Sequence, residues 1–230
     1  MNQEERFFEK DLLLIGAGHT HCIFIKMWAM KKNPSVRVTL INPDPVASYT
    51  GMLPSLIADR VSKSEAQINL FKLCRLIEAR LVLDDVKRID KENSFVECSS
   101  GRKLFFDAIS VNVGSNSIPP IYGLNKYGVS IRPLVKFEEK WREFLQKSVE
   151  SKKTAKIALI GGGIASAELA FSMKIALNKT GRHNSKIIII EMDKVLKDLT
   201  DFQRNFLRKK LTSENVEIRE FSPVKKVLTN

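Results

Sequence analysis

The sequence predicts an α/β fold of two units, each a parallel sheet with flanking helices, together with a small antiparallel meander. Residues 11–39 and, about 145 residues later, residues 156–191 each show the order strand, glycine-rich turn, helix, strand. Short strand patterns at residues 85–106 predict the meander. Because a helix between two strands returns the chain to the end of the sheet at which the first strand began, strands joined in this way run in parallel.

The first unit lies near the start of the chain. Residues 12–15 form an apolar run with the length of a buried strand, and Gly16-Ala17-Gly18 then turns the chain sharply. Helical apolar spacing predicts a helix over residues 19–30, which Asn33-Pro34 ends, and residues 36–41 form the next strand. Such a unit suits a dinucleotide, because glycines let the backbone approach a pyrophosphate and the helix N-terminus offers it unpaired N–H groups.

The second unit repeats this order. Residues 156–177 are a strand, a glycine turn and a helix, and residues 186–191 are a strand that ends in an acid, Glu191. Two such units predict two nucleotide sites in one chain. A single-cofactor NAD(P) dehydrogenase with one structural glycine motif is an alternative. The only histidines, His19, His21 and His183, supply no catalytic constellation for it.

The segment after the first unit, residues 42–54, is predicted to be a loop because it holds three prolines and a glycine. It ends in an apolar cluster, Tyr49, Met52 and Leu53. An apolar loop beside a glycine turn either covers a ligand or packs onto its own core.

The remaining elements follow from periodicity. Helices are predicted at residues 71–80, 134–149 and 200–211, strands at residues 81–83, 85–90, 94–98, 103–106, 107–113 and 216–221, and a crossing segment at residues 118–128. The predicted domains are residues 1–117 and an incomplete second domain, residues 118–230.

Composition places the chain among globular proteins, with 230 residues of which 43% are hydrophobic and 28% charged. No apolar run approaches the roughly 20 residues of a transmembrane helix. The polar, acidic residues before the first strand lack the pattern of a signal peptide, so a cytoplasmic location is expected.

The formal net charge of +12 has three readings: solvated helix faces, attraction to an anionic membrane surface, or attraction to polyanionic cofactors. No recognition helix, RNP or zinc-finger pattern accompanies it, so nucleic acid is not expected as a partner. Cys22, Cys74 and Cys98 are scattered without a CxxC pair, which predicts neither a redox dithiol nor a metal site.

Taken together, the motifs resemble the two-dinucleotide flavoproteins, the pyridine nucleotide–disulfide oxidoreductases, here without the disulfide. The branch is that of type II NADH dehydrogenases, sulfide–quinone reductases and the NADH-dehydrogenase-like flavoproteins, some of which are fused to selenide, water dikinase. The resemblance covers residues 11 to about 224. Its motifs are GAGHTH (16–21), INPDP (41–45), YTGMLP (49–54), DVKRID (85–90), VNVGS (111–115) and GGGIASAELA (161–170).

The resemblance implies that the first unit binds FAD. His21 stands at the third-glycine position of the fingerprint, where it could point toward phosphate or pack. Asn42 replaces the usual acid for the ribose hydroxyls, with Asp44 as a substitute. Residues 50–52 would face the isoalloxazine, and the Val86 backbone would meet the adenine. The FAD residues are Gly16, Ala17, Gly18, His19, Thr20, His21, Asn42, Pro43, Thr50, Gly51, Met52, Val86, Gly114 and Ser115.

The resemblance implies that the second unit binds NAD(P)H. Ser166 replaces its third glycine, and Glu168 would lie near the nicotinamide or simply complement the helix dipole. Glu191 favours NADH, because an acid accepts a 2′-OH and repels a 2′-phosphate, whereas nearby Lys194 opposes this preference. The NAD(P)H residues are Gly161, Gly162, Gly163, Ile164, Ala165, Glu168 and Glu191.

The implied activity is hydride transfer from NADH to FAD, then electron transfer to a small-molecule acceptor such as a quinone. Contact with the inner face of a membrane is compatible with this reading. No catalytic side chain is required, because the cofactors carry the chemistry. The alternative is a truncated nucleotide-binding remnant or regulatory module without turnover. It arises because the GD-containing segment that completes the FAD site in the family is not found before residue 230.

Overall fold

A computed structural model describes residues 8–115, 119–151 and 154–228. The chain divides into two compact units, here called unit 1 (residues 1–49 and 67–115) and unit 2 (residues 50–66 and 116–230). Each is described by itself. The predicted domain boundary between residues 117 and 118 lies outside the described residues, so it stays a prediction.

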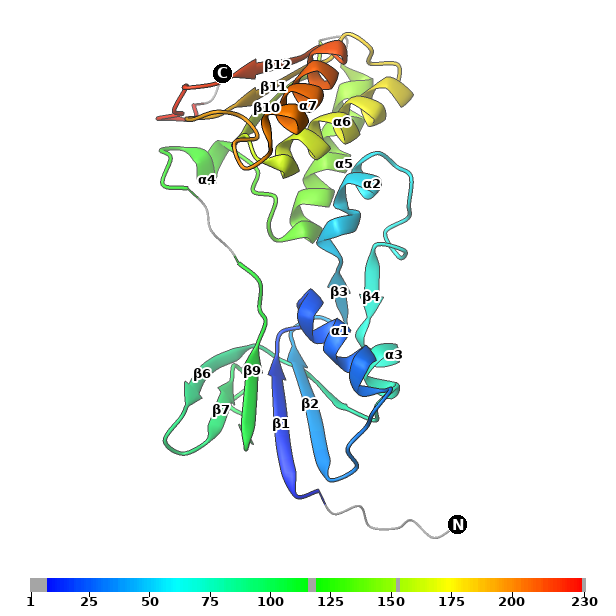
Figure 1. Cartoon of the computed structure of the whole chain (residues 1–230), viewed down its shortest axis with the longest axis vertical. Helices are drawn as coiled ribbons and strands as arrows, with labels where there is room; N and C mark the ends of the chain where they lie inside the picture. The colour runs from blue at the N-terminus through cyan, green and yellow to red at the C-terminus, as the bar shows by residue number, and fades with distance from the viewer. Residues whose placement is uncertain (1–7, 116–118, 152–153, 229–230) are drawn as a thin grey trace. The chain divides into compact units, whose positions relative to one another are not determined.

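Unit 1 is built on a parallel sheet of four strands in the order β5-β2-β1-β9. Figure 1 labels three of them, β2, β1 and β9, in this order. The predicted strand–turn–helix–strand order is confirmed, since the helix α1 (His19–Trp28) follows one central strand along the chain and precedes the other. Glycine residues 16 and 18 therefore sit at the carboxyl edge of this sheet, where α/β proteins bind ligands. The strands are β1 (Lys10–Ile15), β2 (Val36–Asn42), β5 (Arg80–Leu83) and β9 (Ala108–Val111).

Opposite faces of this sheet carry different layers. Leu14 and Leu40 pack with α1 and α3 (Leu70–Arg75), whereas Leu13 and Ile15 pack with the antiparallel meander. This alternation is the period-two pattern of a strand buried on both faces. The meander, predicted from the sequence, consists of β6 (Val86–Asp90), β7 (Phe95–Cys98) and β8 (Lys103–Phe105).

Two predictions about unit 1 and its neighbouring segment are wrong in detail. Residues 42–54 are not a continuous loop, because they contain β3 (Val46–Ser48), which pairs antiparallel with β4 (Gln67–Asn69). The helix predicted over residues 71–80 ends at Arg75, because Glu78 takes a positive φ of 55° and the Ala79 amide closes on the Cys74 carbonyl (2.9 Å).

Unit 2 contains the second strand–turn–helix–strand order, as predicted. Its sheet is parallel with the order β10-β11-β12, and a single core contains residues from its strands and from the helices α2, α5, α6 and α7. The short helix α4 (Leu124–Tyr127) was not predicted. The other elements are β10 (Lys156–Ile160), β11 (Lys186–Ile190), β12 (Val216–Arg219), α2 (Leu53–Ile57), α5 (Leu134–Glu150), α6 (Ile164–Lys179) and α7 (Asp201–Ser213).

The segment of residues 50–66 is anchored in unit 2. Trp141 Nε1 donates a hydrogen bond to the Ile57 carbonyl (3.3 Å), and Lys179 Nζ donates to the carbonyls of Ala58 and Asp59 (2.9 Å each). Leu53 and Ile57 are buried in the same core as Trp141. Of the two readings of the apolar cluster, packing onto a core therefore holds for Leu53.

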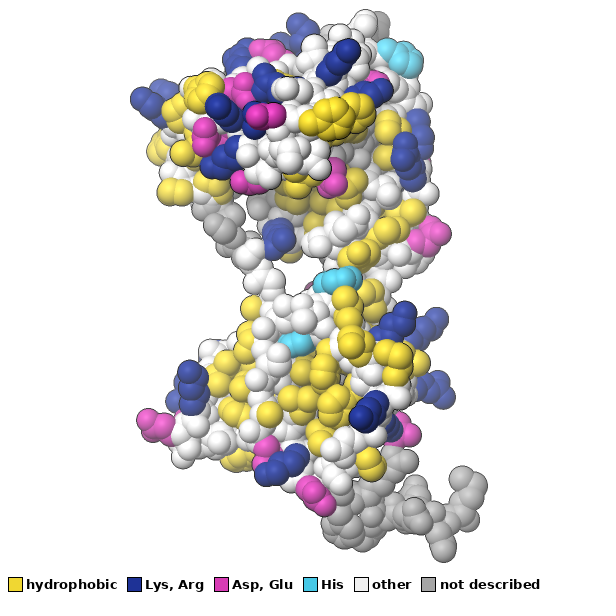
Figure 2. All heavy atoms as spheres, in the orientation of Figure 1, with side chains coloured by type: hydrophobic (Ala, Val, Ile, Leu, Met, Phe, Trp, Pro, Cys, Tyr) yellow, Lys and Arg dark blue, Asp and Glu magenta, His cyan; other side chains and the backbone are white. Residues whose placement is uncertain are grey.

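Basic side chains do not gather in one place on the visible surface. Figure 2 shows Lys and Arg scattered over the visible face of each unit. Across residues 8–115, 119–151 and 154–228, no helix has the length and hydrophobicity needed to cross a membrane.

Candidate functional site

The glycine turn of unit 1 is tightly enclosed. The Gly16 amide donates to the Ile41 carbonyl (2.8 Å), and the Gly18 amide donates to the Asn112 carbonyl (3.1 Å). Gly16 has a φ of +82°, and a Cβ placed on it would lie only 2.5 Å from the Asn112 carbonyl oxygen. Any side chain at this position is thus opposed by both backbone conformation and lack of space.

His21 lies beneath this turn and is buried. Its Nδ1 lies 2.6 Å from the Gly16 carbonyl oxygen, and its Nε2 lies 2.9 Å from Ser110 Oγ on β9. Both ring nitrogens are therefore engaged within unit 1. Of the two roles left open for His21, packing is the one that the structure supports.

Asn42, at the end of β2, ties down the middle of the turn. Its Oδ1 accepts a hydrogen bond from the Ala17 amide (2.9 Å), and its Nδ2 donates to the Asp44 carbonyl (2.7 Å). Asn42, which stands in place of the usual acid, therefore lies against the glycine turn. Both the oxygen and the nitrogen of its amide form hydrogen bonds within the protein. Its predicted contact with a ribose stays a prediction.

The other residues predicted for the first site are distributed over both units. His19, the first residue of α1, stacks on Tyr49 with ring centroids 4.8 Å apart. Val86 begins β6, two residues after Asp84, whose amide donates to the Asn42 carbonyl (3.2 Å). Thr20, Pro43, Gly114 and Ser115 are exposed on unit 1, whereas Thr50, Gly51 and Met52 form the 3-10 helix η1 of unit 2.

Asn112, Ser110 and Tyr49 contact the turn or its helix but are not among the residues predicted as site residues. The signal that could have found Asn112 is an amide side chain inside the apolar run VNV, at the end of a predicted strand. A polar residue at the carboxyl end of a parallel strand is a candidate ligand contact.

The first amide of the glycine turn in unit 2 bonds to the neighbouring strand as in unit 1, but different atoms surround the glycines. The Gly161 amide donates to the Ile190 carbonyl (2.9 Å), and Gly161 has a φ of +105°. A Cβ on Gly161 or Gly163 would meet no atom within 4 Å, whereas one on Gly162 would lie 2.8 Å from Glu191 Cβ. Here it is the middle glycine that is required for space.

Glu191 directly follows β11, and Asn42 is the last residue of β2. Its Oε2 accepts a hydrogen bond from the Gly162 amide (2.6 Å), and its Oε1 accepts one from the Asp193 amide (3.0 Å). The carboxylate therefore ties the glycine turn to the segment that follows β11. Lys194, which was expected to weaken a preference for NADH, is exposed.

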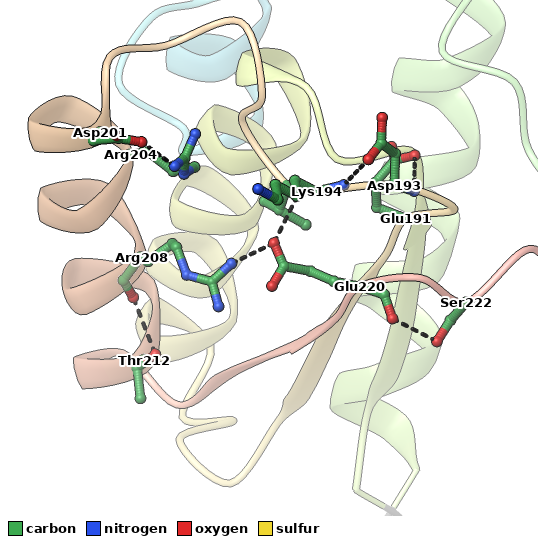
Figure 3. A network of polar contacts seen from close by, with 10 residues as sticks. Glu191, Asp193, Lys194, Asp201, Arg204, Arg208, Thr212, Glu220 and Ser222 are labelled. Atoms are coloured by element: carbon green, nitrogen blue, oxygen red, sulfur yellow. Dashed lines mark hydrogen bonds and ion pairs between the residues drawn. The ribbon is translucent and has the colours of Figure 1, made fainter.

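A network of polar contacts holds the segment between β11 and α7 (Figure 3). Glu220 Oε1 accepts a hydrogen bond from the Val195 amide (2.8 Å) and pairs with the Arg208 guanidinium (2.5 Å). The hydrogen bond from Arg208 holds the pKa of Glu220 below its usual value. Arg204 pairs with Asp201 on the first turn of α7.

The helices that follow the two glycine turns are not capped by side chains. The N-caps of α1 and α6 are Gly18 and Gly163, and neither helix has an acid in its first turn. The second crossover helix of each unit differs, since Asn69 caps α3 and Thr200 forms a capping box with Gln203 on α7. The first N–H groups of α1 and α6 thus lack the side-chain acceptors that α3 and α7 have.

Near the start of α6, Ile164, Ala165 and Glu168 are exposed, so all three are accessible to a ligand at the second turn. The structure does not test their predicted roles. No group of three or more His, Cys, Asp or Glu side chains that could hold a metal occurs among the residues that the structure describes. The three cysteines are free and buried, and burial raises the pKa of Cys74 to about 11.

Comparison with known proteins agrees with this arrangement. A family profile described as pyridine nucleotide-disulphide oxidoreductase matches residues 10–230. No curated protein matches the chain in sequence.

Several solved structures share the fold. NDH2 from Plasmodium falciparum, solved with NADH, matches with a TM-score of 0.80 and 20% identity over 96% of this chain and 49% of its own. The sulfide:quinone oxidoreductase of Aquifex aeolicus matches with a TM-score of 0.77 and 18% identity, over 95% of this chain and 52% of its own. An NAD-dependent persulfide reductase from A. fulgidus matches with a TM-score of 0.77 and 18% identity, over 95% of this chain and 41% of its own. The chain thus spans about half the length of these proteins.

Proposed function

The chain belongs to the pyridine nucleotide-disulphide oxidoreductase family, and from this premise we propose that it is a flavin-dependent NADH oxidoreductase. FAD binds at the glycine turn of unit 1 and NADH at that of unit 2. When bound, FAD supplies the redox chemistry, since it accepts a hydride from NADH and passes the electrons to an acceptor.

The observation that carries the proposal is the pair of uncapped helices behind the two glycine turns. Backbone N–H groups at a helix N-terminus, together with the positive end of the helix dipole, bind phosphate groups. Each unit places one such end at the carboxyl edge of a parallel sheet, and its second crossover helix carries a side-chain cap instead. A chain with two such ends suits two dinucleotides.

In unit 1, the residues that would hold FAD are those of the turn, Gly16 to Thr20, with Asn42 and His21 keeping the turn in shape. Pro43, Val86, Gly114 and Ser115 complete the proposed set within unit 1. Asn42 is neutral, so recognition of FAD in this unit does not depend on a charged side chain from β2.

In unit 2, Gly161 to Ala165 would hold the NADH diphosphate, with Glu168 toward the nicotinamide. Glu191 discriminates between the two nicotinamide coenzymes. Each of its oxygens has a second lone pair beyond the bond it already accepts, so it can also accept a ribose hydroxyl. Its negative charge repels a 2′-phosphate, which favours NADH over NADPH.

We further propose that the electron acceptor is a small molecule such as a quinone, reached at the cytoplasmic face of a membrane. Two observations support this. One neighbour in the comparison is a sulfide:quinone oxidoreductase, and the net charge of +12 favours an anionic surface.

The test is to add FAD to the purified chain, remove unbound flavin, and titrate with NADH and NADPH without oxygen. We expect a flavin spectrum that NADH bleaches, and a Glu191→Ala variant whose preference for NADH over NADPH shrinks by about tenfold. A protein that stays colourless, or whose flavin NADH does not bleach, contradicts the proposal and supports a nucleotide-binding module without turnover.

A further inference from the structure

The two helices of unit 1 present apolar side chains to solvent on their outer side. Helices α1 and α3 cover the same face of the sheet, and their inner residues share one core with Leu14 and Leu40. The outer side of the segments 19–32 and 70–78 is here called the α1–α3 surface. We propose that this surface docks onto an anionic lipid bilayer. The inference deepens the proposed function, in which the electron acceptor is reached at a membrane.

On α1, an exposed apolar stripe lies opposite the buried one. Cys22 and Ile25 are buried in the core. Ile23 and Met27 lie one helical turn apart on the outer side, and Met30 follows in the next turn, where its amide donates to the Met27 carbonyl (3.0 Å). Met27 is 59% exposed and Met30 is 77% exposed. Surface helices normally turn polar side chains to water, so this stripe is an apolar surface without a partner in unit 1.

Helix α3 extends this apolar surface. Phe71 on its first turn and Leu76 directly after it each expose more than half of their surface. The two helices contact each other, and an ion pair between Lys32 and Glu78 (2.9 Å) joins the turns that follow them. Figure 2 shows hydrophobic side chains gathered over α1 and α3, with basic side chains beside them. An exposed apolar patch of this kind marks contact with a protein or a membrane.

The charge of the α1–α3 surface favours the membrane. Its two segments hold a single acid, Glu78, and five basic residues, which are Lys26, Lys31, Lys32, Lys72 and Arg75. All five basic side chains are exposed. A second copy of the chain would bring like charges together, whereas anionic headgroups attract each Lys or Arg by about fivefold in affinity. Apolar residues flanked by Lys and Arg are typical of helices that lie in the lipid interface.

Unit 2 also exposes aromatic side chains, but in a different charge environment. Phe206 on α7 is 56% exposed, close to the value for Met27. Both arginines of α7 are paired with carboxylates, Arg204 with Asp201 and Arg208 with Glu220. These pairs neutralise part of the positive charge near Phe206, so α7 attracts an anionic surface less strongly.

The docking surface and the proposed FAD turn share one helix. Helix α1 begins directly after Gly18 and has ten residues, which corresponds to a length of about 15 Å. A bilayer on the outer side of α1 would therefore lie close to the FAD turn of unit 1. An apolar acceptor such as a quinone dissolves in that bilayer, so docking would shorten its path to the flavin.

The test is flotation of the purified chain with vesicles of phosphatidylcholine alone, and with vesicles of phosphatidylcholine and phosphatidylglycerol in equal parts. We expect binding to the anionic vesicles only, and weaker binding in high salt because salt screens exposed charges. Replacing both exposed methionines, Met27→Ser with Met30→Ser, should weaken binding about tenfold or more. Lys72→Ala and Arg75→Ala should each weaken it about fivefold.

The matched control is Phe206→Ser, which removes an exposed apolar side chain from unit 2 and should leave vesicle binding unchanged. Thermal melting checks that each variant is folded. The inference is overturned if the unchanged chain does not bind the anionic vesicles. It is also overturned if the methionine variant binds as well as the unchanged chain, or if Phe206→Ser weakens binding as much.

A second copy of the chain is the competing occupant of the α1–α3 surface. Light scattering that shows a dimer without lipid, which Met27→Ser with Met30→Ser dissociates, would overturn the inference in favour of that copy. Vesicle binding requires no flavin reduction, so the two proposals fail separately. A chain that binds anionic vesicles but stays colourless with FAD contradicts only the proposed function. Flavin that NADH bleaches in a chain without vesicle binding contradicts only the docking surface.

Discussion

The two glycine turns have similar sequences and are enclosed from different sides. In unit 1 the outer glycines, Gly16 and Gly18, are closed off by Asn112 at the end of β9, and the middle residue is Ala17. In unit 2 the outer positions are open, and the middle glycine, Gly162, is closed off by Glu191. The same motif thus requires its glycines for different reasons in the two units.

The strand-end residues explain part of this difference. Asn42 accepts from the Ala17 amide and donates to the Asp44 carbonyl, whereas Glu191 accepts from both the Gly162 and Asp193 amides. Both side chains accept a hydrogen bond from the middle amide of the glycine turn. They differ in the second hydrogen bond, which Asn42 donates and Glu191 accepts. Substitutions at equivalent positions should therefore have unequal effects, and these are expected to decrease in the order given below.

The largest effect is expected for Gly16→Ala in unit 1. It combines a positive φ with a Cβ 2.5 Å from a backbone oxygen, so it should lower the free energy of unfolding of unit 1 by about 3 kcal/mol. The measurement is the rate of thiol labelling in urea, because Cys22, Cys74 and Cys98 are all buried in unit 1.

The matched control for Gly16→Ala is Gly163→Ala in unit 2, where a Cβ meets open space. It should leave unchanged the urea concentration at which the thiol-labelling rate rises half-way, here called the midpoint. It should lower the free energy of unfolding of unit 2 by less than about 1 kcal/mol. An unchanged midpoint for Gly16→Ala would mean that Asn112 does not close the turn.

The middle positions should show the reverse sensitivity. Gly162→Ala places a Cβ within 3 Å of Glu191 and Val195, so we expect a loss of about 1–3 kcal/mol in unit 2. Ala17→Gly adds freedom to the unfolded chain and removes one buried methyl group, and it should cost about 1 kcal/mol. Unfolding of unit 2 is followed by fluorescence of Trp141 in a Trp28→Phe background, and equal losses for the two variants would contradict the comparison.

Removal of the tethers should have an effect that is no larger. Glu191→Ala leaves two amides without acceptors and should destabilise unit 2 by about 1–3 kcal/mol, because hydrogen bonds to a charged group are the stronger ones. Asn42→Ala should destabilise unit 1 by about 1 kcal/mol. Glu191→Gln, which keeps one acceptor oxygen, should recover part of the loss. If it recovers nothing, the tether is not what Glu191 contributes.

The smallest effect concerns pH and is confined to unit 2. Because the hydrogen bond from Arg208 holds the pKa of Glu220 below its usual value, Glu220 stabilises the folded state above the pKa of an ordinary glutamate, about 4.3. That stabilisation is lost as pH falls through the lower, folded pKa. Glu220→Gln should flatten the decline of unit 2 stability between about pH 5 and 3, whereas the exposed control Glu214→Gln should not. Identical curves for the two variants would rule out this contribution.

The two strand–turn–helix–strand units could be predicted from the sequence because their signals are local. Leu12 to Ile15 and the glycines that follow form one short stretch, and helical periodicity runs through residues 19–28. The meander was predicted for the same reason. These elements also carry the family motifs, so both turns of the candidate site were found.

The contacts that shape the turns could not be predicted in this way. Asn112 reaches Gly18 only because β9 pairs with β1 across almost 100 residues, and His21 reaches Ser110 by the same pairing. The five-residue helix α2 is too short for a periodic signal, and its place in unit 2 depends on Trp141, 84 residues beyond Ile57. Such long-range partners are set by tertiary packing rather than by local pattern.

The most direct test is a calorimetric titration of the chain with FAD and with NADH, each alone and in the presence of the other. Two independent sites predict one FAD and one NADH per chain, with NADH binding weakened by Glu191→Ala and FAD binding unchanged by it. Displacement of one ligand by the other from a single shared site would contradict the assignment of one dinucleotide to each turn.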